Sequence, residues 1–310
     1  MPPIDPLRIQ PYTPLEFYAR EVVEGFITGL HKSPYHGFSV EFAEHRLYNT
    51  GESTRNIDWK LFARTERLFV KRYEEETNLR CQLVIDQSAS MFYPGISQPG
   101  PDNPTKLIFS VYAAAALLFL FRRQRDAVGL TFFNREITQH FPARSNNLHI
   151  QYLFRQLEGL ADSTPPPSPH ESAVADTLHL IAEAVHKRSL VIIFSDMFDK
   201  QNDTEALFHA LQHLRHNKHE VILFHTIDRK TELELGFDNR PYRFIDKETG
   251  REIKVNVAEI RDKYKAAMRR FLDDLKFRCG QYHVDFIEAD ISQGFHQILM
   301  PYLLKRSRLF

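Results

Sequence analysis

The stretch that decides the fold is residues 79–91, which read LRCQLVIDQSASM. Its first part, Leu79 to Ile85, is a short and almost continuous apolar run, which is the pattern of a strand buried on both faces of a sheet. The run ends in Asp86, and Ser88 and Ser90 follow at alternate positions. Because a buried strand needs none of these oxygen atoms for packing, they indicate a binding site where the strand ends.

Outward from this strand, apolar runs and helical periods alternate along the chain. This alternation is typical of a mostly parallel sheet with helices on both faces, so we predict an α/β, doubly wound domain over residues 79–310. The predicted strands are 79–85, 126–133, 137–141, 189–194, 221–227 and 284–287. The predicted helices are 103–123, 148–160, 173–185, 204–216, 258–277 and 295–305. Asn103 is expected to cap the first of these helices.

Two segments depart from that alternation. Residues 241–256 form two alternating runs around the turn Glu248-Thr249-Gly250, which predicts a β-hairpin that we interpret as an insertion. Residues 1–78 show no clean alternation, apart from a helical period over 16–26 and a strand-like run over 67–73. We therefore predict that residues 1–78 form an N-terminal segment that packs against the body.

The composition disfavours several classes of protein. Lys plus Arg and Asp plus Glu number 40 each, so no overall field would attract nucleic acid or an anionic membrane. The longest apolar run, Val111 to Phe121, is about half of the roughly 20 residues that a membrane-spanning helix needs. Cys81 and Cys279 lie far apart in segments with buried character, which disfavours a disulfide framework or a zinc site. Since the start of the chain lacks the pattern of a secretion signal, we expect a cytoplasmic protein.

A second predicted strand, 189–194, also ends in polar residues, including Asp196. The carboxyl ends of parallel strands lie at one edge of a sheet, where α/β proteins place their sites. Asp86 and Asp196 would therefore lie close together, and with the two serine hydroxyls they form an oxygen-only set that suits Mg²⁺. The alternative is structural, because Ser88 or Asp196 can simply cap the following helix, and for Asp196 alone we favour that alternative.

The pattern D-x-S-x-S after an apolar strand, with an aspartate after a second strand, resembles the metal-ion-dependent adhesion site of von Willebrand factor A domains. The resemblance implies that fold for the body and a metal ion held by two serines, two aspartates and a threonine from an intervening loop. No Gly-rich threonine loop is present here, and Ser172 is the preferred substitute, ahead of Thr164 and Thr177. The implied ligands of Mg²⁺ are Asp86, Ser88, Ser90, Ser172 and Asp196.

The N-terminal segment carries a second and longer resemblance. It contains Gly29 and His31, and then EFAEHRLY, GE, RNIDW and ARTERLFV at residues 41–48, 51–52, 55–59 and 63–70. These motifs, which run on into LVIDQSASM, resemble the bacterial family catalogued as domain of unknown function fifty-eight, and their spacing is more specific than the short metal motif. The resemblance implies a non-enzymatic adaptor or chaperone-like protein that works with a MoxR-type AAA+ ATPase.

The residues themselves also allow other functions. A magnesium-dependent phosphoesterase would use Asp86 as its nucleophile, with Asp196 and Asp199 on the metal. The second aspartate that such an enzyme usually has two residues further on is here Ser88, whose hydroxyl cannot act as an acid and base near neutral pH. The glycines of a serine hydrolase, a zinc pattern and a nucleic-acid reading motif are not recognisable. We therefore predict a non-enzymatic, metal-dependent protein-interaction protein.

Overall fold

The computed structural model describes residues 13–31, 45–47, 59–65, 68–71, 79–165, 174–197, 204–247 and 250–306. Backbone contacts group the chain into two compact units, Met1–Phe26 together with Leu79–Phe310, and Ile27–Asn78. The sequence predicts residues 1–78 as one segment, whereas these contacts group Met1–Phe26 with the body. The packing of Ile27–Asn78 on the body stays a prediction.

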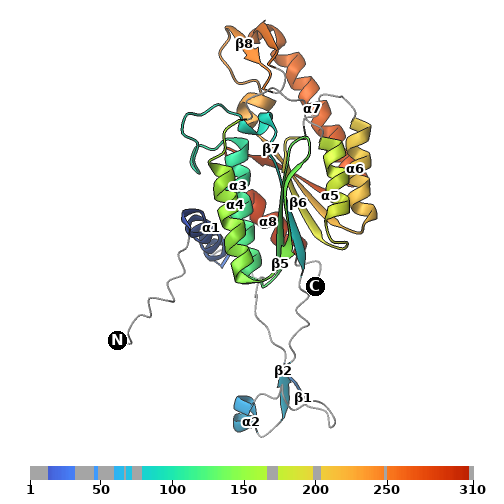
Figure 1. Ribbon diagram of the computed structural model, residues 1–310. Coiled ribbons are helices and arrows are strands. Elements are labelled where there is room, and N and C mark those ends of the chain that lie inside the picture. The colour runs from blue at the N-terminus through green and yellow to red at the C-terminus, as the bar shows by residue number, and fades with distance from the viewer. Residues whose placement is uncertain are drawn as a thin grey trace, which may run out of the picture. The chain divides into compact units, whose positions relative to one another are not determined.

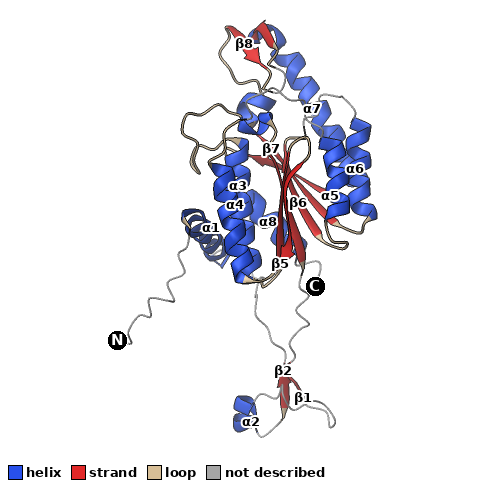
Figure 2. Ribbon diagram, viewed as in Figure 1, coloured by secondary structure: helices blue, strands red, loops and turns tan. Residues whose placement is uncertain are grey.

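The core of the first unit is a six-stranded sheet with the strand order β10-β7-β6-β3-β4-β5. Its strands in chain order are β3 (Arg80–Asp86), β4 (Ala127–Phe133), β5 (Ile137–Arg144), β6 (Leu190–Ser195), β7 (Glu220–Ile227) and β10 (Val284–Asp290). Neighbouring strands in this sheet are parallel, except for the antiparallel pair β4 and β5. The predicted mostly parallel sheet is therefore confirmed, and Figure 2 shows it in red between the helices.

The order of the strands reverses at β3. From β3 the chain adds β4 and then β5 on one side, and it then crosses back to add β6, β7 and β10 on the other side. The region outside the carboxyl ends of β3 and β6 is therefore the switch point of the sheet, where open α/β sheets bind their ligands. The topology alone thus indicates where a site is to be expected.

Helices cover both faces of the sheet, as Figure 1 shows. On one face lie α3 (Lys106–Arg123), α4 (Asn147–Ala161) and α8 (His296–Arg306), with α1 (Pro14–His31) beside them. On the other face lie α5 (Val174–Ala184), α6 (Thr204–His216) and α7 (Val257–Gln281). An ion pair between Glu16 and Arg122 joins α1 to α3, and the rings of Tyr18 and Tyr112 meet edge-on at 4.8 Å between centroids.

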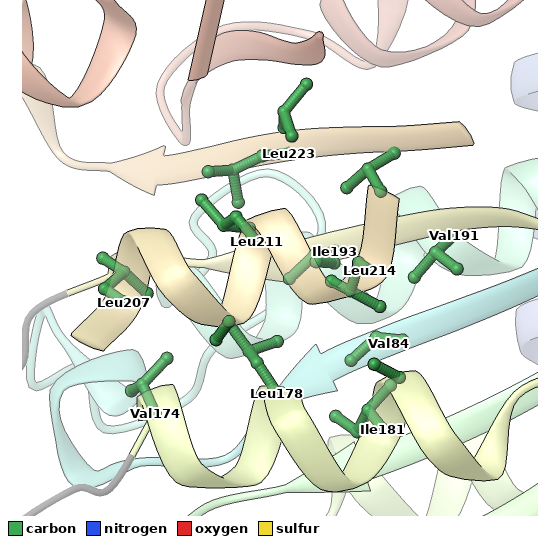
Figure 3. Packing of buried hydrophobic residues seen from close by; sticks show 14 of the residues in the cluster. Val84, Val174, Leu178, Ile181, Val191, Ile193, Leu207, Leu211, Leu214 and Leu223 are labelled. Carbon is green, nitrogen blue, oxygen red and sulfur yellow. The ribbon is translucent and has the colours of Figure 1, made fainter. Parts of the chain in front are cut away.

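Apolar side chains fill the space between the sheet and its helices, because consecutive residues of a strand point to opposite faces. The cluster beneath α5 and α6 contains buried residues from three helices and five strands, including Val84, Leu178, Ile193, Leu211 and Leu223 (Figure 3). Burying each such side chain stabilises the fold by roughly 1.5–3 kcal/mol. The packed sheet therefore holds the ends of the loops at its carboxyl edge in fixed positions.

The start of α3 differs from the prediction. The sequence predicts a cap at Asn103, but the helix begins at Lys106, and the Thr105 hydroxyl caps it by accepting a hydrogen bond from Ile108 N at 3.2 Å. Asn103 instead pairs with Gly100 through two backbone hydrogen bonds of 3.2 Å. Both residue types suit a cap, so the local sequence could not choose between them. The shift places Lys106 in the first turn, where its side chain reaches the carboxyl end of β6.

Smaller elements complete the fold. At the predicted hairpin, β8 (Pro241–Ile245) pairs antiparallel with β9 (Glu252–Asn256). One short helical turn, η3 (Ala89–Phe92), follows β3, and another, η4 (Arg229–Leu233), follows β7. The second unit contains α2 (Trp59–Thr65) and an antiparallel pair of strands, β1 (His45–Leu47) and β2 (Phe69–Lys71). Within the described ranges, every helix is too short or too polar to cross a membrane.

Gly129 of β4 gives a test of the packing in the sheet. A Cβ atom at this position would meet Gln82 Oε1 and would lie 2.5 Å from Phe141 O and 2.8 Å from Ala143 N, two backbone atoms that cannot easily move. We expect Gly129→Ala to lower the free energy of unfolding by about 1–3 kcal/mol through overpacking. Chemical denaturation measures this change.

Gly159→Ala is the matched control, because a Cβ atom at Gly159 meets nothing within 4 Å. This residue lies inside α4, so alanine should raise the free energy of unfolding by up to about 1 kcal/mol. A Gly129→Ala protein as stable as the wild type would contradict the close approach of β3, β4 and β5.

Candidate functional site

The candidate site lies at the switch point, between the carboxyl ends of β3 and β6. Asp86 is the last residue of β3, and Asp196 follows the last residue of β6. The two strands run parallel in register up to Ile85 and Phe194, so they end at the same edge of the sheet. Both carboxylates are buried, with Asp86 0% and Asp196 1% exposed. Two acidic groups are thus held in the interior, close enough to influence each other's charge.

Asp86 is fixed by hydrogen bonds to both of its carboxylate oxygens. Oδ1 accepts from Ser88 N at 2.8 Å, and Oδ2 accepts from Ser195 Oγ at 2.6 Å. Ser195 Oγ in turn accepts from Met197 N at 2.9 Å. Burial, and after it the charge of Asp196, raise the pKa of Asp86 to about 7, although the hydrogen bonds from the two serines act in the opposite direction. A cation nearby would favour the ionised form.

The Ser88 and Ser90 hydroxyls follow Asp86 closely, and their oxygen atoms are 3.0 Å apart. In an octahedral Mg²⁺ site with bonds of about 2.0–2.1 Å, adjacent ligand oxygens are about 2.9 Å apart. The two hydroxyls therefore fit neighbouring positions around such an ion. Within the described ranges, three or more His, Cys, Asp or Glu side chains nowhere come together in a group that could hold a metal, so hydroxyl oxygens would have to take part.

A lysine that the sequence analysis did not single out lies in the site. Lys106 Nζ donates to Asp196 Oδ2 at 2.7 Å and to Glu232 Oε1 at 2.6 Å. The Lys106 side chain is fully buried, and that of Glu232 is 17% exposed. Burial by itself would lower the pKa of Lys106, but Asp196 and Glu232 together raise it above its usual range, so the ammonium group stays charged. Burial raises the pKa of Glu232, and the charge of Lys106 opposes that change.

Glu232 connects the site to the segment that follows β7. Its Oε2 accepts a hydrogen bond from Asp228 N at 2.8 Å, and its backbone carbonyl accepts one from Tyr264 Oη of α7 at 2.7 Å. Thr231, beside it in η4, accepts a hydrogen bond from Tyr93 Oη at 2.6 Å. The ammonium group is thus linked through Glu232 to η4 and α7.

His225 of β7 adds no positive charge to this region near neutral pH. It is fully buried, and burial lowers its pKa to about 4, with Asp196 and Lys106 exerting smaller and opposite effects. A neutral imidazole is therefore expected beside the charged cluster. The charges that balance the buried carboxylates must come from other groups.

Four of the five predicted ligands of the metal ion lie among the described residues. Asp86, Ser88, Ser90 and Asp196 all lie at the switch point, whereas Ser172 lies outside the described residues. Of its two alternatives, Thr177 is buried and donates its hydroxyl to Arg135 O at 2.8 Å, and Thr164 is exposed. For Asp196 the capping alternative stays a prediction, because residues 198–203, which precede the described start of α6 at Thr204, lie outside the described residues. Ser88 precedes η3, but its side chain makes no capping hydrogen bond.

One signal in the sequence could have pointed to Lys106. A lysine in the first turn of a helix is opposed by the helix dipole, so such a residue calls for an acidic partner. That signal depends on the true start of α3, which the predicted cap placed too early. Glu232 carries no comparable signal, since η4 is a short turn after a strand.

The fold and the site define an α/β protein with a mostly parallel sheet, helices on both faces and a cluster of hydroxyl, carboxylate and ammonium groups at its switch point. The family model described as "Protein of unknown function DUF58" matches residues 44–272, and the chain belongs to that family. The family resemblance seen in the sequence is thereby confirmed.

Relatives with similar sequences include the uncharacterized proteins Rv1480 of Mycobacterium tuberculosis and Mb1516 of Mycobacterium bovis. Each is 26% identical over 214 residues, a match that covers 69% of this chain and 63% of the relative. The match thus spans less than two thirds of the length of these relatives.

Two solved structures are similar at low sequence identity. The conserved hypothetical protein BatB from Bacteroides thetaiotaomicron has a TM-score of 0.43 and 13% identity, over 75% of this chain and 100% of that one. A mutant of the PilB minor pilin from Streptococcus sanguinis has a TM-score of 0.40 and 5% identity, over 78% of this chain and 65% of the pilin chain. Similarity at this level says nothing about the function of this chain.

The raised pKa of Asp86 predicts a pH dependence of stability in the presence of a chelator. Because the folded pKa of about 7 lies above the ordinary aspartate value of 3.8, the folded state holds the proton more tightly than the unfolded state. The free energy of unfolding should therefore fall as the pH rises from about 4 to about 7, by about 1.4 kcal/mol for each pH unit in this range.

Asp86→Asn removes this titration, so its stability should change less over the same pH range than that of the wild type. Denaturant unfolding at a series of pH values measures the difference between the two curves. Asp238→Asn, at a carboxylate that is 83% exposed, is the control and should follow the wild type. If the stability of Asp86→Asn and that of the wild type changed with pH in the same way, the raised pKa of Asp86 would be contradicted.

Proposed function

We propose that this protein is a non-enzymatic interaction protein of the von Willebrand factor A-like class, whose strand-end site binds Mg²⁺ and presents it to an acidic group of a protein partner. The observation that carries the proposal is the pair of hydroxyls of Ser88 and Ser90, 3.0 Å apart, next to two buried carboxylates at the switch point. Magnesium prefers oxygen ligands and is commonly held by one or two carboxylates together with waters and an oxygen of another molecule.

The residues that would hold the ion have distinct roles. Asp86 and Asp196 supply negative charge, and Ser88 and Ser90 supply neutral oxygens. Asp86 is already oriented by two hydrogen bonds, so little reorganisation of that side chain is required. When bound, Mg²⁺ would supply a positive charge that can accept a carboxylate from the partner.

The arrangement of Asp86 favours this function over a magnesium-dependent phosphoesterase. A nucleophile must reach its substrate, but Asp86 is 0% exposed and both of its oxygens accept hydrogen bonds inside the protein. Ser88, where an acid and base would be needed, instead lies 3.0 Å from the hydroxyl of Ser90. These contacts support a binding role.

The family resemblance suggests the partner, a MoxR-type AAA+ ATPase, for which this protein would be an adaptor or chaperone-like component. An acidic side chain of the ATPase would complete the coordination of Mg²⁺, so assembly would depend on the metal. We place this function in the cytoplasm, a reducing compartment that suits the buried free thiols of Cys81 and Cys279.

The proposal predicts metal-dependent binding of the partner. In pull-down and calorimetric titrations with a purified MoxR-type ATPase of the same genome, we expect binding in Mg²⁺ and at least about tenfold weaker binding in chelator. Asp86→Asn and Ser90→Ala should weaken binding in Mg²⁺ to a similar extent, because each removes a ligand. Melting temperatures show whether each variant is folded.

Ser97→Ala is the matched control, since Ser97 is an exposed serine in the loop after η3 and should leave binding unchanged. Binding that is equally strong in Mg²⁺ and in chelator would contradict the proposal. Hydrolysis of phosphoesters that is present in the wild type and lost in Asp86→Asn would instead favour the enzyme.

A further inference from the structure

The ammonium group of Lys106 is positioned like a bound cation. It lies 2.7 Å from Asp196 Oδ2 and 2.6 Å from Glu232 Oε1, at the end of a fully buried side chain. These are the distances of strong, charge-assisted hydrogen bonds. A positive charge is therefore built into the site through α3.

One of its two partners is also a proposed ligand of the metal. Asp196 lies at the switch point with Asp86, and the ammonium group already satisfies its Oδ2 atom. A divalent ion that binds the same carboxylate would lie close to a fixed positive charge. Like charges repel each other strongly at the effective dielectric of a protein site, so the two cations oppose each other.

We infer that Lys106 is a tethered cation that competes with a divalent metal ion for Asp196 and thereby sets the affinity of the site for metal. The inference rests on the proposed metal-dependent function. When the metal takes Asp196, Lys106 loses its contact with Asp196 and keeps Glu232 of η4 as its partner. In the absence of metal, Lys106 neutralises the buried carboxylates and keeps the site folded.

A purely structural ion pair is the competing explanation. Removing one partner of a buried pair leaves an uncompensated charge and commonly destabilises a protein. Loss of stability in a Lys106 variant is therefore expected under both explanations and does not separate them. The affinity for the metal separates them, because a structural pair away from the metal would leave it unchanged.

The experiment compares four full-length proteins: the wild type, Lys106→Met, the double variant Lys106→Met/Glu232→Gln, and Lys263→Met. Methionine keeps most of the volume of the lysine side chain. The double variant removes one positive and one negative charge, so it preserves the charge balance of the site while removing the contact of Lys106 with Asp196. Lys263 is exposed on α7 and serves as the control for loss of a lysine.

Calorimetry with Mg²⁺ and electron paramagnetic resonance with Mn²⁺ measure the affinity, and thermal melting in metal and in chelator measures its coupling to folding. We expect both Lys106 variants to bind at least about tenfold more tightly than the wild type, since a nearby like charge has been removed. Their melting temperatures should also rise more on addition of Mg²⁺ than that of the wild type, whereas Lys263→Met should behave as the wild type.

The results separate a failure of the competition by Lys106 from a failure of the metal-dependent function. If the wild type binds the metal and both Lys106 variants bind it no more tightly, the competition is refuted while the metal-dependent function stands. If only Lys106→Met binds more tightly and the double variant does not, the gain reflects net charge rather than release of Asp196, and the competition is again refuted. If all four proteins fail to bind divalent ions, the proposed function falls and the inference falls with it.

Discussion

The structure around the switch point depends on one constraint, the burial of two carboxylates at the ends of adjacent parallel strands. β3 and β6 are neighbours because the chain reverses its strand order there. β3 ends in Asp86 and β6 is followed directly by Asp196, and both acidic residues have almost no contact with water. Removing an ion from water costs several kcal/mol even after the protein relaxes, so such groups persist only with partners of opposite charge or with hydrogen bonds. The surrounding residues can be understood as the groups that satisfy this requirement.

The two carboxylates are satisfied in different ways. Asp86 accepts hydrogen bonds from a backbone amide and from the Ser195 hydroxyl, and its pKa is raised to about 7, mainly by burial, so part of the cost is avoided by protonation near neutral pH. Asp196 is instead paired with the ammonium group of Lys106, which also contacts Glu232. One carboxylate is thus held mainly by neutral donors and the other by a full positive charge. Under the proposed function, this asymmetry makes Asp86 and the serine hydroxyls the part of the site that would accept an added cation.

The same contacts join the site to the rest of the first unit. Glu232 lies in η4, its carbonyl is bound by Tyr264 of α7, and α7 follows directly after the β8–β9 hairpin. These contacts form a continuous path, so a change in charge at the strand ends can affect η4 and α7. This arrangement would serve the proposed interaction function, because the state of a small polar site could alter the elements that surround it. Family membership does not itself assign a function.

Much of this architecture follows from the sequence by itself. The buried strands, the helices between them and the meeting of Asp86, Ser88, Ser90 and Asp196 follow from local patterns, because an apolar run of this length forms a strand and parallel strands end at one edge. The start of α3 at Lys106 was not predictable, since Asn103 and Thr105 both suit a cap. Nor were the partners of Lys106, which lie 90 and 126 residues away along the chain. Only the tertiary structure brings these charges together, because their pairing depends on how helix, strand and turn pack and not on any spacing in the sequence.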